Sequence, residues 1–149
     1  MTERRAGEPA TDAGLLYLDT SAAVKLVRPE AHSAVLTTWL SASWSGRVVS
    51  SVLLEVELPR AIRRTAPDRL DRVPAILAGF DLVTLSDDVV RTAAGFADPL
   101  LRSLDAVHLA SAQLIAEAAS GLTALVAYDT RLLGAATELG LAVAAPGLR

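Results

Sequence analysis

The segment Leu15-Leu-Tyr-Leu-Asp-Thr-Ser21 is a short apolar run that ends in an acid followed by two hydroxyl residues. Its apolar part, Leu15–Leu18, predicts a buried first strand. Thr20 or Ser21 can cap a helix that starts with Ala22. In α/β folds, ligands bind beyond the carboxyl ends of the strands, so an acid at this position marks a candidate site.

The rest of the chain continues this alternation of strand and helix. We expect strands at 47–50, 81–85, 123–128 and 141–144, and helices at 29–44, 51–65, 67–77, 86–97, 103–120 and 130–139. Pro59 lies inside the helix expected at 51–65 and predicts a kink or a break there. Strands that alternate with helices imply a parallel sheet with helices on both of its faces.

The helix expected at 103–120 is the longest, with Ser103 as its predicted cap and Gly121 closing it. Its apolar residues recur at helical spacing, which predicts one buried face. That face comprises Leu104, Val107, Ser111, Leu114, Ile115 and Ala118.

Length and composition favour a single folded domain. The 149 residues fit one domain, which we expect at 15–149 behind a flexible, polar tail at 1–14. Hydrophobic residues make up 52%, so the chain as a whole is not disordered. Aromatic residues make up only 4%, so the core must consist of Ala, Leu and Val, which favours helices packed closely around a small aliphatic sheet.

The chain has no cysteine, and this excludes disulfides and thiolate metal sites. Any metal must therefore bind to oxygen or imidazole. This composition is compatible with a reducing cytosol, and we expect the protein in the cytoplasm. No apolar stretch reaches the roughly 20 residues that a membrane span needs, and segment 1–14 lacks the apolar core of a secretory signal, so we expect no membrane association.

The charge distribution leaves nucleic-acid binding open. A net charge of −3 argues against a nucleic-acid partner, which normally requires a basic surface. However, five arginines lie close together in sequence, at Arg60, Arg63, Arg64, Arg69 and Arg72. They form either a solvated helix face or a surface that contacts RNA.

Four acids stand out by their positions. Asp19 and Asp129 each follow an expected strand, whereas Glu57 and Asp105 lie in otherwise apolar helical segments. A buried carboxylate is costly unless its charge is neutralised, and four converging carboxylates would repel one another. A divalent cation would relieve this repulsion, and hard oxygen ligands suit Mg²⁺ or Mn²⁺. Such ions can activate water and orient a phosphodiester for hydrolysis.

Each acid also has a purely structural explanation. Asp105 lies in a first helical turn, where the helix dipole favours negative charge, and Asp129 is placed to cap a helix. Asp19 could be a turn residue. Glu55 and Glu57 are two residues apart and so face nearly opposite sides of a helix, which leaves open which of them is buried. The combination of four, rather than any single acid, indicates a site.

Four stretches resemble the PIN-domain ribonucleases, and specifically the VapC-like toxins of type II toxin–antitoxin pairs. They are Leu16–Ala22, Ser50–Ala61, Leu101–Ala112 and Tyr128–Leu132, in the family's order. The second carries the family's Glu-Leu-x-Arg segment and places the family glutamate at Glu57. The third is the most specific match. The resemblance covers roughly 15–146 and implies an α/β, PIN-like three-layer fold, with a central, mostly parallel sheet of four to five strands flanked by helices.

The resemblance also implies a function. Asp19, Glu57, Asp105 and Asp129 would be the catalytic, metal-binding quartet, with Thr20 or Ser21 supporting the first acid. The implied activity is that of an endoribonuclease toxin that hydrolyses phosphodiester bonds in RNA with Mg²⁺ or Mn²⁺. Family members are held inactive by a cognate VapB-like antitoxin and often form homodimers.

Two positions depart from the family pattern. Pro59 would bend the helix that presents Glu57, and Ala127 stands where relatives often carry a hydroxyl residue. His108 could pair with Asp105 or contact a phosphate, although a structural histidine is the simpler interpretation.

Two other functional classes remain open. The pair Asp87-Asp88 invites a phosphoacceptor module of the response-regulator type, but the last strand lacks the expected lysine, because Lys25 is the only lysine of the chain. The second alternative is a PIN-fold binding protein with weak or no catalysis, for which Pro59 is the main argument.

Overall fold

The computed structural model describes residues 14–118 and 121–148. Within them, five parallel strands form one sheet in the order β3-β2-β1-β4-β5. The strands are β1 (Leu15–Leu18), β2 (Arg47–Ser51), β3 (Asp81–Val83), β4 (Ala124–Val126) and β5 (Val143–Ala144). The expected parallel sheet is confirmed, and each predicted strand is found within a few residues of its predicted bounds.

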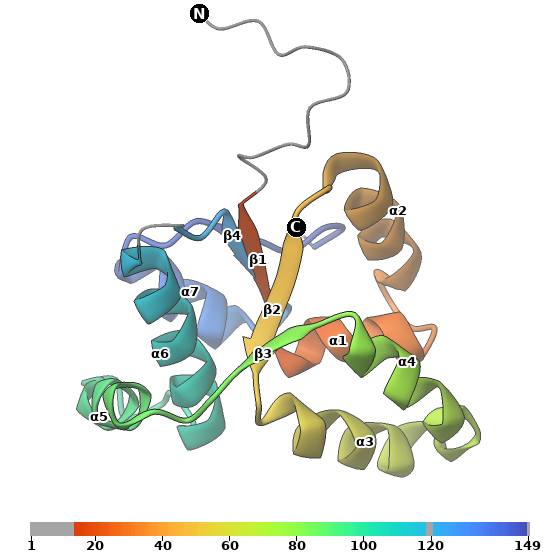
Figure 1. Ribbon diagram of the computed structural model, residues 1–149, viewed down its shortest axis with the longest axis horizontal. Coiled ribbons are helices and arrows are strands. Elements are labelled where there is room, and N and C mark those ends of the chain that lie inside the picture. Colours follow the sequence, from red (N-terminus) through yellow and green to blue (C-terminus); the bar gives the residue numbers. More distant parts are fainter. Residues whose placement is uncertain (1–13, 119–120, 149) are drawn as a thin grey trace, which may run out of the picture.

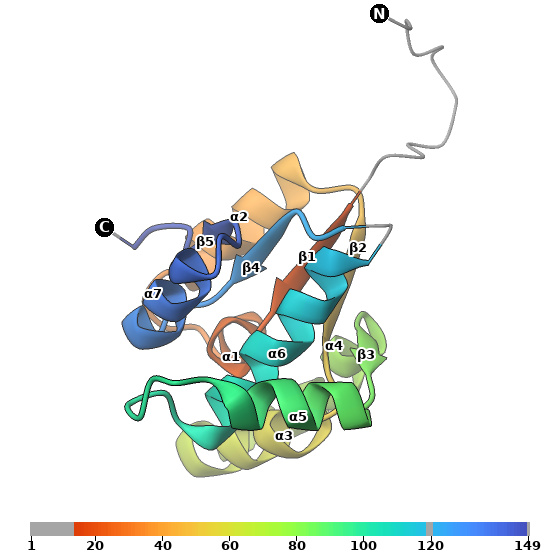
Figure 2. The same ribbon diagram turned by 90° about the vertical axis from the view of Figure 1, so that its left-hand side faces the viewer.

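Helices cover both faces of this sheet. They are α1 (Thr20–Val27), α2 (Ser33–Ser43), α3 (Leu54–Thr65), the 3₁₀ helix η1 (Pro67–Arg72), α4 (Val73–Ala78), α5 (Asp87–Gly95), α6 (Ser103–Glu117) and α7 (Thr130–Glu138). In Figure 1, α1 to α4 lie on one side of the sheet and α5 to α7 on the other. Figure 2 shows α6 lying over the sheet with α5 outside it. The expected three-layer α/β architecture is confirmed.

The alternation of side chains along β1 explains these layers. Leu16 and Leu18 point to one face and pack with Leu36 of α2, whereas Tyr17 points to the other face and packs with Leu109 of α6 and the first turns of α7. All three strand residues are almost completely buried. A central parallel strand is expected to be apolar on both faces, as this one is.

A third apolar cluster fixes α3 beside α1. Leu54, Leu58 and Ile62 are spaced four residues apart, lie on one face of α3 and are fully buried against Ala23 of α1 and Val73 of α4. This packing sets the rotation of α3 about its axis, and therefore decides which of its polar residues can reach the end of the sheet.

Two of the expected helix caps were wrong. The N-cap of α1 is Asp19 rather than Thr20 or Ser21, because the Asp19 carboxylate accepts the Ala22 amide at 3.1 Å. Ser103 is the first residue of α6 and does not cap it. Of the kink or break expected at Pro59, the break does not occur, because α3 continues through this residue. Proline removes the bond that its own amide would donate one turn back and crowds that carbonyl, but the other hydrogen bonds of the helix can still form.

The expected tail at 1–14 lies, apart from Gly14, outside the described residues. In the part of the chain that the structure describes, no helix has the length and apolar character needed to cross a membrane.

Candidate active site

The topology brings Asp19 and Asp129 to the same end of the sheet, beyond the carboxyl ends of its strands. They follow β1 and β4, which are neighbouring parallel strands, and the Asp19 amide donates to the Val126 carbonyl at 3.2 Å. After β1, the chain adds β2 and β3 next to one side of this strand, and it later adds β4 and β5 next to the other side. Such a reversal of strand order is where open α/β sheets bind ligands.

Asp19 is a buried carboxylate with incomplete compensation. Its exposed fraction is 3%, and one oxygen, Oδ1, accepts from Ser21 Oγ at 2.6 Å and from the Ala22 amide at 3.1 Å. Burial raises the pKa of Asp19 from 3.8 to about 6, although the hydrogen bond from Ser21 opposes this, and the charge of Asp105 raises it further. An unneutralised charge in this position would be stabilised by a cation.

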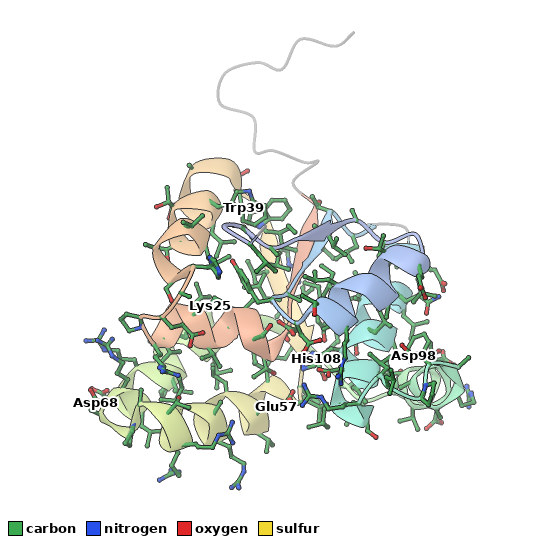
Figure 3. All side chains as sticks on the ribbon, turned by 180° about the vertical axis from the view of Figure 1, so that it is seen from behind. Lys25, Trp39, Glu57, Asp68, Asp98 and His108 are labelled. Carbon is green, nitrogen blue, oxygen red and sulfur yellow. The ribbon has the colours of Figure 1, made fainter. Side chains whose placement is uncertain are left out.

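Glu57 reaches the same end of the sheet from α3. Its Oε1 accepts from Thr20 Oγ1 at 2.9 Å and from His108 Nε2 at 2.7 Å, whereas Glu55 is exposed. Figure 3 shows Glu57 and His108 near each other, between α3 and α6. Burial alone raises the pKa of Glu57, but the hydrogen bonds from His108 and Thr20 outweigh burial, so its pKa lies below the usual value. Of the two glutamates, Glu57 therefore faces the site, and the proline in α3 does not prevent this.

Asp105 and Asp129 are bridged by an arginine. Arg102 Nε lies 3.4 Å from Asp105 Oδ2, and its Nη2 lies 3.5 Å from Asp129 Oδ2. The other oxygen of Asp129 caps α7 by accepting the amides of Arg131 and Leu132, both at 3.0 Å. Burial raises the pKa of Asp105, the charge of Arg102 lowers it, and the charge of Asp129 raises it. The guanidinium thus occupies a position between two carboxylates that a metal cation would favour.

As the side chains stand, no three His, Asp or Glu residues within 14–118 and 121–148 are grouped closely enough to hold a metal ion. Arg102 lies between two of the acids, where a bound cation would be favoured. The donor set itself fits a hard cation, since it offers carboxylate oxygens, one of them buried. Glu57, Asp105 and Arg102 also line one pocket of about 300 Å³.

The sequence did not indicate two of the residues in this arrangement. Tyr17 was expected only as a core residue, yet its hydroxyl lies 2.7 Å from His108 Nδ1. A tyrosine in an otherwise aliphatic buried strand was a usable signal, because a buried phenol hydroxyl needs a partner. The other residue is Arg102, which stands three residues before Asp105, a spacing at which side chains on a helix meet.

A second pocket adjoins the first. Its volume is about 380 Å³, and it shares Glu57 and Leu104 with the first pocket. Two arginines of α3, Arg60 and Arg64, also line it. Arg63 does not. Arg69 and Arg72 line a different pocket, together with Lys25, Pro29 and residues of α2.

The family comparison gives the class of this fold. The family model of the PIN domain matches residues 16–137, which include all four acids. Ribonuclease VapC35 of Mycobacterium tuberculosis is 50% identical over 133 residues, covering 89% of this chain and 98% of the relative. Ribonuclease VapC47 of the same species is 40% identical over 137 residues, covering 89% of this chain and 98% of the relative. The chain belongs to the VapC family of PIN-domain proteins.

Solved structures share the fold. The crystal structure of Mycobacterium tuberculosis VapC20, described as a sarcin–ricin-loop-cleaving toxin, matches with a TM-score of 0.65 at 19% identity and covers 80% of this chain and 94% of VapC20. A chain of the Rickettsia felis VapBC2 complex with a promoter DNA fragment matches with a TM-score of 0.55 at 14% identity, covering 87% of this chain and 97% of that chain.

The response-regulator alternative finds no support in this structure. Asp87 and Asp88 are exposed in the first turn of α5, and Asp88 pairs with Arg91 at 2.6 Å. They are surface residues of a helix in a PIN-family protein, rather than acids of an enclosed pocket.

Proposed function

We propose that this protein is an endoribonuclease toxin that hydrolyses phosphodiester bonds in RNA with Mg²⁺ or Mn²⁺. The proposal is supported by contacts that connect the four acids: His108 bonds to Glu57, Arg102 bridges Asp105 and Asp129, and the charge of Asp105 acts on Asp19. The ribonuclease names of VapC relatives at 50% and 40% identity support the same activity.

The four acids would hold the cation, and Thr20 would keep Glu57 in place. A divalent cation bound there supplies charge that neutralises phosphate oxygens and helps to orient the attacking water. Arg102 is 72% exposed, so its side chain can turn away from Asp105 and Asp129 toward solvent. We infer that the carboxylates are then free for the cation, and that the pocket lined by Glu57 and Asp105 receives the scissile phosphate.

A matched pair of variants on α3 tests this assignment. We expect Glu57→Gln to slow RNA cleavage by at least about 100-fold, because loss of a metal ligand should exceed the 10–100-fold typical of an outer-shell partner. Glu55→Gln, two residues away but exposed, should cleave at the wild-type rate. The assay is cleavage of a labelled RNA by purified protein with Mn²⁺ and without antitoxin. Equal rates for wild type and Glu57→Gln would remove Glu57 from the site.

The same assay addresses the binding-protein alternative. A wild-type protein that retains labelled RNA in the presence of Mn²⁺ but does not cut it would favour a PIN-fold binding protein. The observed course of α3 removes the main argument for that alternative, since Pro59 does not turn Glu57 away.

We propose that the RNA backbone follows the pocket along α3. Arg60 and Arg64 are one helical turn apart and line the same pocket as Glu57, so their guanidinium groups can contact phosphates that flank the cut. We expect Arg60→Ala and Arg64→Ala to weaken RNA binding, and each to reduce the slope of log affinity against log salt by about 1. Arg63→Ala, on the same helix but outside the pocket, is the control and should leave the slope unchanged. A uniform effect of all three variants would indicate general attraction by charge.

The partners are proposed on the basis of family membership. We propose a VapB-like antitoxin as the inhibitor, supported by the VapC relatives and by the fold likeness to a chain of a VapBC complex. We propose the cytoplasm as the compartment, which suits a chain without cysteine that acts on RNA. The homodimer remains a prediction, which sedimentation equilibrium of the purified protein would test.

A further inference from the structure

His108 is a buried histidine whose two ring nitrogens both have partners. Its exposed fraction is 1%. The Tyr17 hydroxyl lies 2.7 Å from Nδ1, and the Glu57 carboxylate lies 2.7 Å from Nε2. The tyrosine and histidine rings meet edge to face, with centroids 5.8 Å apart. A buried imidazole is costly unless its nitrogens are bonded, so this arrangement fixes the orientation of the ring.

The resulting chain of hydrogen bonds connects four elements of the fold. It runs from Tyr17 on β1 through His108 on α6 to Glu57 on α3, where Thr20 of α1 also donates. Tyr17 is fully buried, and burial raises the pKa of its hydroxyl, so it remains an O–H group. Because Tyr17 is held in the central strand, it provides a rigid anchor for the series of hydrogen bonds that ends at Glu57.

These hydrogen bonds fix how the Glu57 carboxylate is held. Its Oε1 accepts hydrogen bonds from both Thr20 and His108, whereas among the described residues no hydrogen bond to Oε2 is found. The carboxylate is thus held by one oxygen and leaves the other for a ligand. Glu57 also lines the pocket that it shares with Asp105.

We propose that Tyr17 and His108 are positioning residues that hold Glu57 by Oε1, so that Oε2 is oriented to bind the cation. This inference rests on the proposed function, in which Glu57 is a ligand of Mg²⁺ or Mn²⁺. Groups that orient a ligand through its second atom typically change metal affinity by 10–100-fold when they are removed.

The experiment measures Mn²⁺ affinity by isothermal titration calorimetry on metal-stripped, full-length protein. Tyr17→Phe removes one hydroxyl and keeps the ring, and it should weaken Mn²⁺ binding by about 10-fold or more. The control is Tyr128→Phe, which also removes a tyrosine hydroxyl bonded to a protein acceptor, in this case the Pro146 carbonyl at 2.9 Å. Tyr128→Phe should bind Mn²⁺ with wild-type affinity, even if its melting temperature falls as much as that of Tyr17→Phe.

The same substitution made in the Glu57→Gln variant shows whether Tyr17 affects Mn²⁺ affinity through Glu57. In Glu57→Gln protein, the further change Tyr17→Phe should have no additional effect on Mn²⁺ affinity, because the ligand that Tyr17 positions is already absent. At His108, glutamine can still donate a hydrogen bond to Oε1 but alanine cannot. We therefore expect His108→Gln to bind Mn²⁺ more tightly than His108→Ala.

Two outcomes would overturn the proposal and can be told apart. If wild-type protein binds Mn²⁺ and Tyr17→Phe binds it equally well, Tyr17 does not position Glu57, and the proposed function is unaffected. If wild-type protein neither binds Mn²⁺ nor cleaves RNA, the proposed function fails and the positioning role fails with it.

Discussion

Asp19→Asn is expected to abolish RNA cleavage and, in metal-free protein, to raise the free energy of unfolding at pH 7 by about 3 kcal/mol. Burial raises the pKa of Asp19 from 3.8 to about 6, and one pKa unit corresponds to about 1.4 kcal/mol. Asparagine is nearly isosteric, and its oxygen can still accept from Ser21 and from the Ala22 amide. The variant therefore loses the costly buried charge while it keeps the cap of α1.

The sign of this effect depends on pH. Because the pKa of Asp19 is higher in the folded than in the unfolded state, the folded state binds more protons between about pH 4 and pH 6. Wild-type stability should fall through this range as the pH rises, and then level off. Urea denaturation in EDTA, at several values between pH 4.5 and pH 7.5, would show the advantage of Asp19→Asn growing up to about pH 6. Parallel pH profiles for the two proteins would contradict the burial of an ionisable Asp19.

Removal of divalent cations is the second change with a large expected effect. Treatment with EDTA should stop RNA cleavage, and Mn²⁺ in excess over EDTA should restore it, because the carboxylates are proposed to act through a cation. Since the cation binds the folded state, Mn²⁺ at 100 times its Kd should also stabilise wild-type protein by about 2.7 kcal/mol. Asp19→Asn, which lacks one proposed ligand, should gain much less at the same Mn²⁺ concentration.

Activity and stability together make this test stringent. Cleavage that persists in EDTA, after the protein has been stripped of metal, would contradict the proposed chemistry even if the fold is unchanged. A gain in melting temperature that is equal for wild type and for Asp19→Asn would indicate that Mn²⁺ binds elsewhere on the protein.

Much of the fold could be predicted because its signals are local. The strand β1 is an apolar run with an acid directly after it, and its predicted bounds are those observed. Which face of each helix is buried was harder to predict. Leu104 was assigned to the buried face of α6 but is 49% exposed, whereas Ala110 and Ala112 are fully buried. Helix α6 packs against the sheet, α5 and α7, so its buried surface is not the single stripe that periodicity assumes.

The sequence allowed the four acids to be proposed as a site, but it did not indicate which residues each of them contacts. Four acids could be named because each falls at a strand end or on an apolar helix. Their partners depend on how helices distant in sequence pack together, which no local pattern encodes. His108 is buried, as the structural interpretation expected, but it bonds to Glu57 rather than to Asp105, since α3 packs beside α1 and brings the Glu57 carboxylate to α6.

The exposure of Arg102 bears on how quickly the protein could take up the proposed cation. An exposed side chain changes rotamer within picoseconds to nanoseconds, far faster than a loop or domain can move. If this arginine is the group that a cation displaces, no backbone element has to open before the ion enters. Activation of the proposed toxin would then be limited by the supply of the cation and by the departure of the proposed antitoxin, rather than by a slow rearrangement of the fold.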